Sequence, residues 1–356
     1  MGERKFLTNK IKRLIYSFFI LIIAGTSIGF VLVYEESLNK INGDENLIDG
    51  KIFLENKEFS TVFLDGEYIY AGGSGGLFKI HINTYEIKEV LNGDKSFEIV
   101  RGIGKTSDNI LWIGHGGGLT GIKNDEIIKH YTISNGLPDN RINDIEIKNG
   151  IIYVATFGGV GIIENEKIRT ITEDNGLIKN ITKVVMVDNK GNLWCGSHTS
   201  IGGGVTLVNE VDMDYEMIYF NTENGLTHNA ITSIKEDKQG NVWIGNGNMT
   251  RGGATSYTLK NGEWIPSKIL TIKEGLIGDK VRHIFIDYMD NLWFCSESDG
   301  IAVFNNIDDI KYLTSESGLS DNEVKEIIYD QDMNLWLASK NGITKIFNEW
   351  LRININ

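Results

Sequence analysis

A short motif centred on tryptophan returns along this chain at nearly constant spacing, and it limits the fold more than any other feature of the sequence. Its clearest copy reads Gly191-Asn192-Leu193-Trp194. A repeat of this period is the signature of a solenoid or a propeller, so it decides the architecture before any single motif is interpreted. The seven aligned aromatic residues are Tyr70, Trp112, Tyr153, Trp194, Trp243, Trp293 and Trp336.

Every repeat from about residue 58 onward contains four β-patterned runs. The first run is rich in β-branched residues, as at 142–147, and the second carries the repeated aromatic residue. A Gly-rich connection precedes the third run, and a Gly-Leu pair such as Gly136-Leu137 leads from the fourth run into the next repeat. Four antiparallel strands per repeat form the blade of a β-propeller. The sequence therefore predicts an all-β fold, a seven-bladed β-propeller of four-stranded antiparallel blades over residues 58–356.

Asparagine-containing pairs predict the tight turn between the third and fourth strands of a blade. Asn tolerates the left-handed backbone conformation that such hairpins need. A separate run, Lys51-Ile52-Phe53-Leu54-Glu55, is expected to form an extra strand that pairs with the last blade and helps to close the ring. The predicted hairpin pairs are Asn124-Asp125, Asn165-Glu166, Asn261-Gly262, Asn305-Asn306 and Asn348-Glu349.

Aspartates six residues before the repeated aromatic predict structural turns. Asp at the first position of a type I turn accepts backbone N–H bonds, and Gly191 and Gly240 follow three residues later in two repeats. Because these aspartates belong to separate blades, they predict no metal site, and no cofactor is expected. The repeated aromatic residues are expected to pack between neighbouring blades. The four aspartates are Asp188, Asp237, Asp287 and Asp330.

An apolar run near the N-terminus predicts one transmembrane helix. Residues 14–33 contain no charged side chain and are long enough to cross the hydrocarbon core of a bilayer. Basic residues precede the run and acidic residues follow it, so the positive-inside rule places the N-terminus in the cytoplasm. A cleaved signal peptide is the alternative. The predicted order is a basic cytoplasmic segment at 1–13, a single-pass cell-membrane anchor at 14–34, a stalk at 35–57 and an extracytoplasmic propeller at 58–356.

Charge, cysteine content and missing motifs narrow the functional classes. The formal net charge of −13 argues against nucleic acid as a partner, because nucleic-acid-binding surfaces are basic. Cys195 and Cys295 lie in non-adjacent repeats, too far apart for a disulfide, and are expected to be buried free thiols. The sequence contains no nucleophile elbow, HExxH motif or P-loop, so we assign no catalytic residue.

Loop lengths indicate that one face of the predicted disc is a binding surface. In a four-stranded blade, the loop between the second and third strands shares a face with the loop that joins successive blades. The first kind of loop is longest in repeats four and five, at 197–201 and 246–251. Binding sites are commonly built from such variable loops on a regular scaffold. The predicted site is the central depression of this face, biased toward blades four and five, and it suits a polar, sugar-like or anionic small ligand. The candidate ligand-binding residues are His198, Asn246, Asn248, Arg251, His115, Phe157, Glu297, Lys340 and His228.

The repeat resembles that of the two-component-regulator propeller family. The resemblance is clearest at Asn224-Gly225-Leu226, Asp237 and Gly240-Asn241-Val242-Trp243-Ile244-Gly245. In that family, propellers form the extracytoplasmic sensor region of membrane histidine kinases, often responding to carbohydrates. The β-sandwich, second membrane helix and kinase that usually follow are missing from this sequence. The resemblance implies a sensor-like module that binds a polar small molecule such as a carbohydrate, lacks its own kinase and signals through a membrane partner.

A second resemblance keeps an enzyme as the alternative. The pattern from Asp287 to Phe294 also looks like the repeat of streptogramin lyases, seven-bladed propellers with a metal-assisted His/Glu site. That resemblance would place His198, His228, His283 and Glu297 in a catalytic set. A third interpretation is a protein–protein interaction scaffold that uses the faces of the disc. Converging His and Glu side chains would favour the enzyme, a concave pocket the sensor, and a flat face the scaffold.

Overall fold

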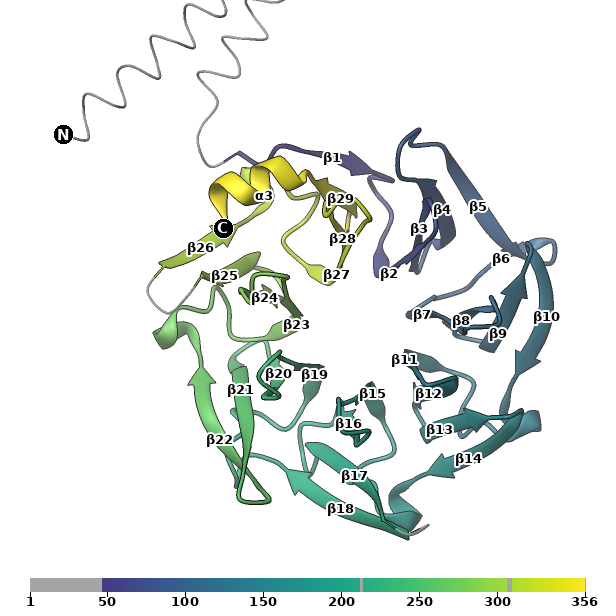
Figure 1. The fold of residues 1–356 in the computed structure, drawn as a ribbon, viewed down its shortest axis with the longest axis vertical. Coiled ribbons are helices and arrows are strands. Elements are labelled where there is room, and N and C mark those ends of the chain that lie inside the picture. The colour runs from purple at the N-terminus through teal and green to yellow at the C-terminus, as the bar shows by residue number, and fades with distance from the viewer. Residues whose placement is uncertain (1–46, 212–213, 306–308, 356) are drawn as a thin grey trace, which may run out of the picture. The chain divides into compact units, whose positions relative to one another are not determined.

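The fold is a closed ring of antiparallel sheets. A computed structural model of the chain describes residues 47–211, 214–305 and 309–355. Seven sheets surround a central axis, and each contributes four antiparallel strands to the ring (Figure 1). The predicted seven-bladed β-propeller is confirmed.

Blades one to four follow the chain in order. Blade one contains β2 (Phe59–Asp65), β3 (Tyr68–Gly73), β4 (Gly76–His81), β5 (Ile87–Asn92) and the short additional strand β6 (Lys95–Ser96). Blade two contains β7 (Gly102–Lys105), β8 (Leu111–His115), β9 (Gly118–Lys123) and β10 (Glu126–Tyr131). Blade three contains β11 (Ile142–Lys148), β12 (Ile151–Thr156), β13 (Gly159–Glu164) and β14 (Lys167–Ile171). Blade four contains β15 (Thr182–Val187), β16 (Leu193–Ser197), β17 (Val205–Val211) and β18 (Asp214–Phe220).

Blades five to seven complete the ring. Blade five contains β19 (Ile231–Glu236), β20 (Val242–Asn248), β21 (Arg251–Lys260) and β22 (Glu263–Leu270). Blade six contains β23 (Val281–Ile286), β24 (Leu292–Ser296), β25 (Ile301–Asn305) and β26 (Asp309–Leu313). Blade seven contains β27 (Val324–Tyr329), β28 (Leu335–Ser339) and β29 (Gly342–Ile346). In Figure 1 the first strand of each blade lies nearest the axis; these strands are β2, β7, β11, β15, β19, β23 and β27.

Four of the connections between successive blades share a compact turn. In these four, a single turn of 3-10 helix is followed by a glycine with positive φ, as at Gly136, and then by a buried leucine such as Leu137. Glycine is the residue that adopts this left-handed conformation without steric cost, which explains the repeated Gly-Leu pair. The 3-10 helices are η1 (Ile133–Asn135), η2 (Glu173–Asn175), η3 (Ile272–Glu274) and η4 (Ser315–Ser317).

Blade seven takes its fourth strand from the beginning of the propeller. β1 (Gly50–Phe53) pairs antiparallel with β29, so that Gly50 faces Ile346 and Phe53 faces Ile343. The ring of Phe53 stacks on Trp336 with 5.3 Å between centroids. The predicted closing strand is confirmed, and the two ends of the ring are joined by main-chain hydrogen bonds.

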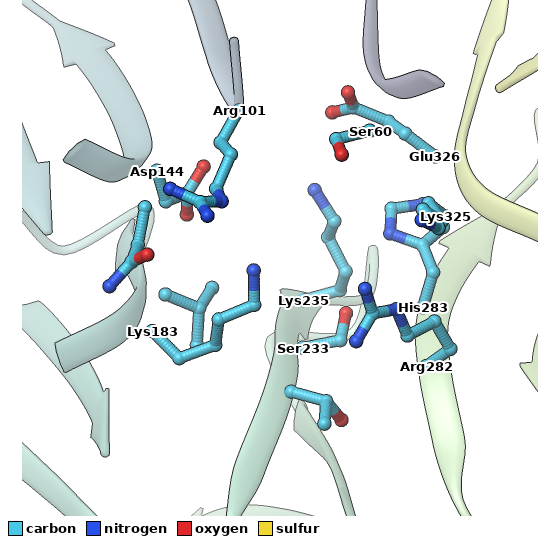
Figure 2. A pocket seen from close by; sticks show the side chains of 13 residues that line it. Ser60, Arg101, Asp144, Lys183, Ser233, Lys235, Arg282, His283, Lys325 and Glu326 are labelled. Carbon is cyan, nitrogen blue, oxygen red and sulfur yellow. The ribbon is translucent and has the colours of Figure 1, made fainter. Parts of the chain in front are cut away.

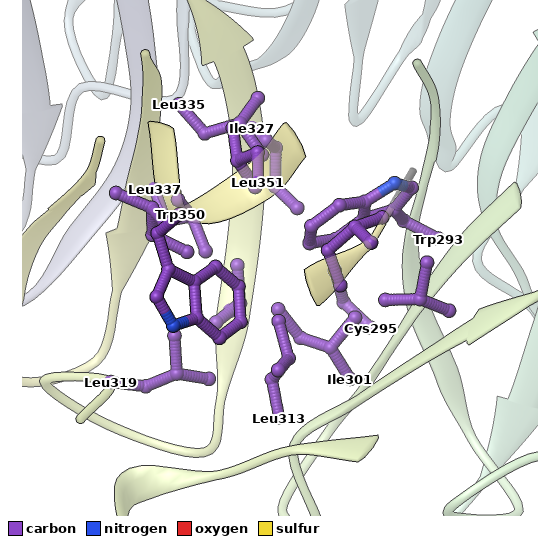
Figure 3. Packing of buried hydrophobic residues seen from close by; sticks show 14 residues of the cluster. Trp293, Cys295, Ile301, Leu313, Leu319, Ile327, Leu335, Leu337, Trp350 and Leu351 are labelled. Atoms are coloured by element: carbon purple, nitrogen blue, oxygen red, sulfur yellow. The ribbon is translucent and has the colours of Figure 1, made fainter. Parts of the chain in front are cut away.

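The predicted hairpin at Asn348-Glu349 is wrong. These residues begin α3 (Asn348–Asn354), because β1 already occupies the outer edge of β29 and leaves the chain no sheet edge to pair with. The helix instead buries Trp350 and Leu351 in the core between blades six and seven (Figure 3). The hairpins at Asn124, Asn165 and Asn261 are confirmed by positive φ values at these asparagines, and part of the Asn305-Asn306 pair lies outside the described residues.

The repeated aspartates organise the turn after the first strand of four blades. In blade four, Asp188 Oδ1 accepts hydrogen bonds from the backbone N–H groups of Lys190 and Asn192 at 2.9 and 2.8 Å. Its other oxygen accepts the indole N–H of Trp194 at 3.0 Å. Blades five, six and seven repeat both arrangements at Asp237, Asp287 and Asp330. The structural role predicted for these aspartates is confirmed, and the bond to tryptophan is an addition to it.

The cores lie between blades, as the repeated aromatic residues predict. Trp194 of blade four packs in one cluster with Ile231 and Ile244 of blade five. Trp293 of blade six likewise packs against Leu335 and Leu337 of blade seven. Each tryptophan therefore joins its own blade to the next one.

Two further predictions concern the cysteines and the membrane anchor. Cys195 and Cys295 are buried free thiols, as predicted, and burial raises the pKa of both. The predicted anchor at 14–34 lies outside the described residues. Among the residues that are described, no helix is long and apolar enough to cross a membrane.

Candidate functional site

The inner strands share a β-bulge close to where they begin. In blade three, Ile142 pairs with Thr156 and Asp144 pairs with Ala155, so Asn143 is an extra residue without a partner in the ladder. A bulge of this kind re-aims side chains next to it. Blades one and four to seven have the same interruption, and in blade two Arg101 directly precedes β7. We call these seven residues the axial ring: Ser60, Arg101, Asn143, Lys183, Thr232, Arg282 and Lys325.

A cavity of about 100 Å³, here called the axial cavity, opens where the axial ring meets the axis (Figure 2). All seven ring residues line it. In five blades the next residue lines it as well, which is the expected result of a bulge that turns two consecutive side chains inward. These next residues are Asp144, Val184, Ser233, His283 and Glu326, and Lys235 completes the lining.

Several polar side chains in the lining hold neighbouring blades together. Asn143 donates its side-chain N–H to the carbonyl of Thr182 in the next blade at 2.8 Å. Three others accept a backbone N–H from the first strand of the following blade, and these bonds satisfy groups that would otherwise be buried without partners. They are Asp144 with Val185 at 3.1 Å, Ser233 with Ile284 at 3.1 Å, and Glu326 with Val62 at 2.9 Å.

The basic side chains on the blade six and seven side of the cavity are paired with carboxylates. Arg282 lies 3.5 Å from a Glu297 oxygen and 3.8 Å from a Glu323 oxygen. Lys325 contacts Glu58 and lies 3.4 Å from Glu323. These acidic residues neutralise their partners, so this part of the cavity has little uncompensated charge.

Arg101, Lys183 and Lys235 differ from that paired group. None of the three side chains makes a hydrogen bond or an ion pair within the described part of the chain, and Figure 2 shows their nitrogen atoms directed into the cavity. Burial, together with the charge of Arg282, lowers the pKa of Lys183 to about 8, because neighbouring cations and lost hydration both disfavour its ammonium form. Burial also lowers the pKa of the Arg101 guanidinium.

The pKa values of three further lining residues, Asp144, Glu326 and His283, are shifted in the direction that favours their neutral forms. Burial raises the pKa of Asp144 and of Glu326. His283 is 7% exposed, and burial, with Lys235 and Arg282 nearby, lowers its pKa well below the ordinary value. Its Nε2 is buried and has no hydrogen-bond partner among the described residues. The axial cavity therefore contains three cations without a carboxylate partner and the neutral imidazole of His283, whose Nε2 makes no hydrogen bond to a described residue.

The structure brings together four of the residues predicted from the loops of blades four and five. His228 lies 3.3 Å from the side-chain nitrogen of Asn248, and Asn248 accepts the backbone N–H of Arg251 at 3.0 Å. Asn246 is fully buried and accepts a hydrogen bond from the Thr227 hydroxyl. These bonds join the residues that precede blade five to the end of β20, and Asn246 Nδ2 is buried without a partner among the described residues.

The remaining predicted residues lie on separate blades of the same face. His115 is buried against the Thr120 hydroxyl at 2.9 Å, and burial lowers its pKa to about 4. Partial burial and then the charges of Lys183, Lys280 and Arg282 lower the pKa of His198. The other three contact charged partners: Phe157 lies under the Arg141 guanidinium at 4.2 Å, Glu297 lies 3.1 Å from Lys280, and Lys340 lies 3.8 Å from Glu323.

Of the residues that line the axial cavity, sequence reasoning named only His283, and only in the lyase-like alternative. A usable signal was nevertheless present, because the ring residue stands five positions before the turn residue in each tryptophan repeat, as Lys183 does before Asp188. At that position and the next one the repeats differ in charge and size, while the position before it is always β-branched or aromatic. The prediction instead followed loop length, which changes at a different point of the same face.

Comparison with known proteins supports the repeat and the fold. A family model described as "Two component regulator propeller" matches residues 225–248, which confirms the predicted resemblance. One similar structure is the extracellular domain of a protein described as a hybrid two-component system from B. thetaiotaomicron. The two chains are 21% identical with a TM-score of 0.69, and the match covers 88% of this chain and 41% of that one. The extracellular domain of a protein from the same organism described as a one-component system gives 17% identity, a TM-score of 0.69 and coverages of 85% and 40%. The chain thus spans about two fifths of the length of these domains.

Enzymes of the lyase type share the same scaffold. A catalytically inactive variant of virginiamycin B lyase from Staphylococcus aureus, solved with quinupristin, has 17% identity, a TM-score of 0.65 and coverages of 84% and 98%. A comparison with curated proteins found no match. At these identities the similarity shows the fold alone. Within the described ranges, no group of three or more His, Cys, Asp or Glu side chains is placed to hold a metal ion.

Proposed function

We propose that this chain is a membrane-anchored sensor propeller that binds a polar small molecule, such as a carbohydrate or its charged derivative, in the axial cavity. The observation that supports this proposal most strongly is that all seven blades direct a residue of the axial ring into one cavity. These residues differ between blades. A scaffold built only for stability has no need of different side chains at one repeated position. Small-ligand sites in proteins are concave and contain a few convergent polar groups.

Two observations support a sensor module. The match to the two-component regulator propeller and the similar extracellular domains agree with an extracytoplasmic location. The predicted site face carries the axial cavity, with His198, Glu297 and Lys340 near charged residues of its rim. In this proposal a ligand reaches the cavity from that face, and a membrane partner transmits the signal.

Blocking the cavity without changing its charge tests where the ligand binds. Ser60 belongs to the axial ring, and among the described residues its side chain makes no hydrogen bond to another blade. Ser60→Trp should fill the cavity, and Ser200→Trp, on an exposed loop, is the matched control. Thermal shifts of the full chain against a panel of neutral sugars and small organic acids measure binding, because a ligand that prefers the folded state raises the melting temperature. Shifts that persist in Ser60→Trp, or a panel without any specific shift, would contradict the proposal.

The location can be tested independently. Because both native cysteines are buried, a new thiol at Ser200→Cys would be the only reactive one among the described residues. A membrane-impermeant maleimide should label this variant in intact cells. Labelling only after the membrane is permeabilised would exclude an extracytoplasmic propeller.

A further inference from the structure

Resting on the proposed function, we infer that the axial cavity binds a compact oxyanion, of the size and charge of a sulfate or phosphate group, between Arg101, Lys183 and Lys235. Five basic side chains line the cavity against two carboxylates, Asp144 and Glu326. This local excess of positive charge occurs in a chain whose formal net charge is −13. The cavity is therefore opposite in sign to the protein as a whole.

The two sides of the cavity differ in how their cations are neutralised. Arg282 and Lys325 are each held by glutamates at the rim. Asp144 and Glu326 already accept backbone N–H groups of the next blade. Arg101, Lys183 and Lys235 lack such partners within the described residues. Arg101 and Lys183 are partly buried and Lys235 is exposed to the cavity. Like charges held this close repel one another, so an anion that neutralises the three cations would be favoured.

His283 provides a second, independent observation. Its Nε2 is buried and unpartnered in the part of the chain that the structure describes, and the side chain lines the same cavity beside Lys235. A neutral imidazole can donate one N–H, and an oxyanion offers acceptors in several directions. The cations and His283 together supply the charge-assisted and neutral donors that anion sites use.

The size of the cavity suits a compact anion. Its volume of about 100 Å³ is well above the roughly 10–15 Å³ that one water needs, so a tetrahedral oxyanion can lie between Arg101, Lys183 and Lys235. A larger ligand that carries such a group can place it there and extend toward the rim.

Titration calorimetry on the full chain with sodium sulfate tests the inference, with ionic strength balanced by sodium chloride. The variants are Lys183→Met, Lys235→Met and the double variant, and Lys260→Met on the opposite face is the matched control, since Lys260 is exposed. Each single cavity variant should weaken sulfate binding by about tenfold, as expected for losing one charge-assisted bond, and the double variant should abolish it. Lys260→Met should bind like the parent chain. Calorimetry is preferred over thermal shift here because sulfate stabilises most proteins without binding a site.

A sulfated monosaccharide and its unsulfated parent sugar distinguish the source of the anion. Tighter binding of the sulfated sugar than of inorganic sulfate assigns the cavity to an anionic group of a larger molecule, and the reverse order assigns it to a free inorganic anion; both support the inference. Absence of sulfate binding, or equal binding in the double variant, would overturn it. If the neutral sugar binds and Ser60→Trp abolishes that binding while sulfate has no effect, the anion inference fails and the proposed function survives.

Discussion

The two ends of each inner strand contrast in what the repeats keep constant. At one end, four blades place an aspartate that caps a turn and accepts the indole N–H of a tryptophan, as in Asp287 and Trp293 at 3.1 Å. At the other end, five residues earlier, the axial ring holds serine, arginine, asparagine, lysine or threonine depending on the blade. Where the side chain has to do the same structural task in each blade, the residue repeats. Where the side chains meet at a common cavity, they differ, and this difference locates the site better than any single motif.

The largest expected change in stability follows from disrupting the turn that the repeated aspartates organise. Asp287 is 3% exposed and accepts the backbone N–H groups of Met289 and Asn291 as well as the Trp293 indole. Asp287→Ala leaves these donors without an acceptor and should lower the free energy of unfolding by about 3 kcal/mol. Urea denaturation measures the loss, with the exposed Asp174→Ala as control. If sulfate affinity of the folded variant fell as far as in Lys183→Met, the two ends of the strand would not be functionally separate.

At the axial ring we expect a gain in stability, in contrast to the loss expected for Asp287→Ala. Lys183→Met removes a partly buried cation that lies among other cations, so the free protein should gain about 1–2 kcal/mol of stability at neutral pH while it loses anion binding. Groups that act on the Lys183 charge are Asp144, which favours it, and Arg101, Arg282 and Lys325, which oppose it. A chemical denaturation curve without added anion measures the gain. A clear loss of stability would mean that Lys183 has a structural role.

The stability gain of Lys183→Met should depend on pH, because the pKa of Lys183 differs between the folded and the unfolded state. The pKa of Lys183 is lowered from 10.5 to about 8 in the folded state. Below pH 8 the folded chain bears the full cost of the buried charge, and the cost disappears as pH rises from 8 toward 10.5, because the folded state then releases the proton first. The advantage of Lys183→Met over the parent chain should therefore be constant below about pH 8 and vanish by about pH 10.5. Denaturation midpoints of both proteins across this range check the prediction, which a pH-independent difference would contradict.

A smaller loss is expected from the bonds that join blades within the lining. Ser233 accepts the N–H of Ile284 at 3.1 Å and is 2% exposed. Ser233→Ala should cost about 1 kcal/mol, since one buried donor loses its partner. The exposed Ser200→Ala is the control and should be neutral. No measurable cost at Ser233 would indicate that the polar lining does not contribute to blade packing.

The smallest changes in stability and in sulfate affinity are expected for a substitution in the long loop of blade five. Arg251 is exposed, and Arg251→Ala should change stability by less than about 0.5 kcal/mol. Sulfate affinity, measured by calorimetry, should stay within about twofold of the parent chain. A loss comparable with that of Lys183→Met would move the site from the axial cavity toward the group of His228, Asn248 and Arg251.

Periodicity made the fold predictable, and the site depended on details that periodicity does not contain. The spacing of Trp194, Trp243 and Trp293 was enough to infer the blades and their cores, and the separate run at 51–55 indicated the closing strand. The helix after Ile346 was missed because β1 had already taken the sheet edge that a hairpin would have used, a competition between distant segments. The axial ring was missed because the inward direction of Lys183 depends on a bulge, and a one-residue shift in register is not visible in the alternation of a short strand.

The central claim is that the chemically varied ends of the inner strands form an anion site at the axis. Crystals of the full chain grown with selenate, which replaces sulfate and gives an anomalous signal, test it most directly. We predict one strong anomalous peak in the axial cavity, within hydrogen-bond distance of Arg101, Lys183 and Lys235. An empty cavity with selenate bound only at the outer loops or surface would contradict this account.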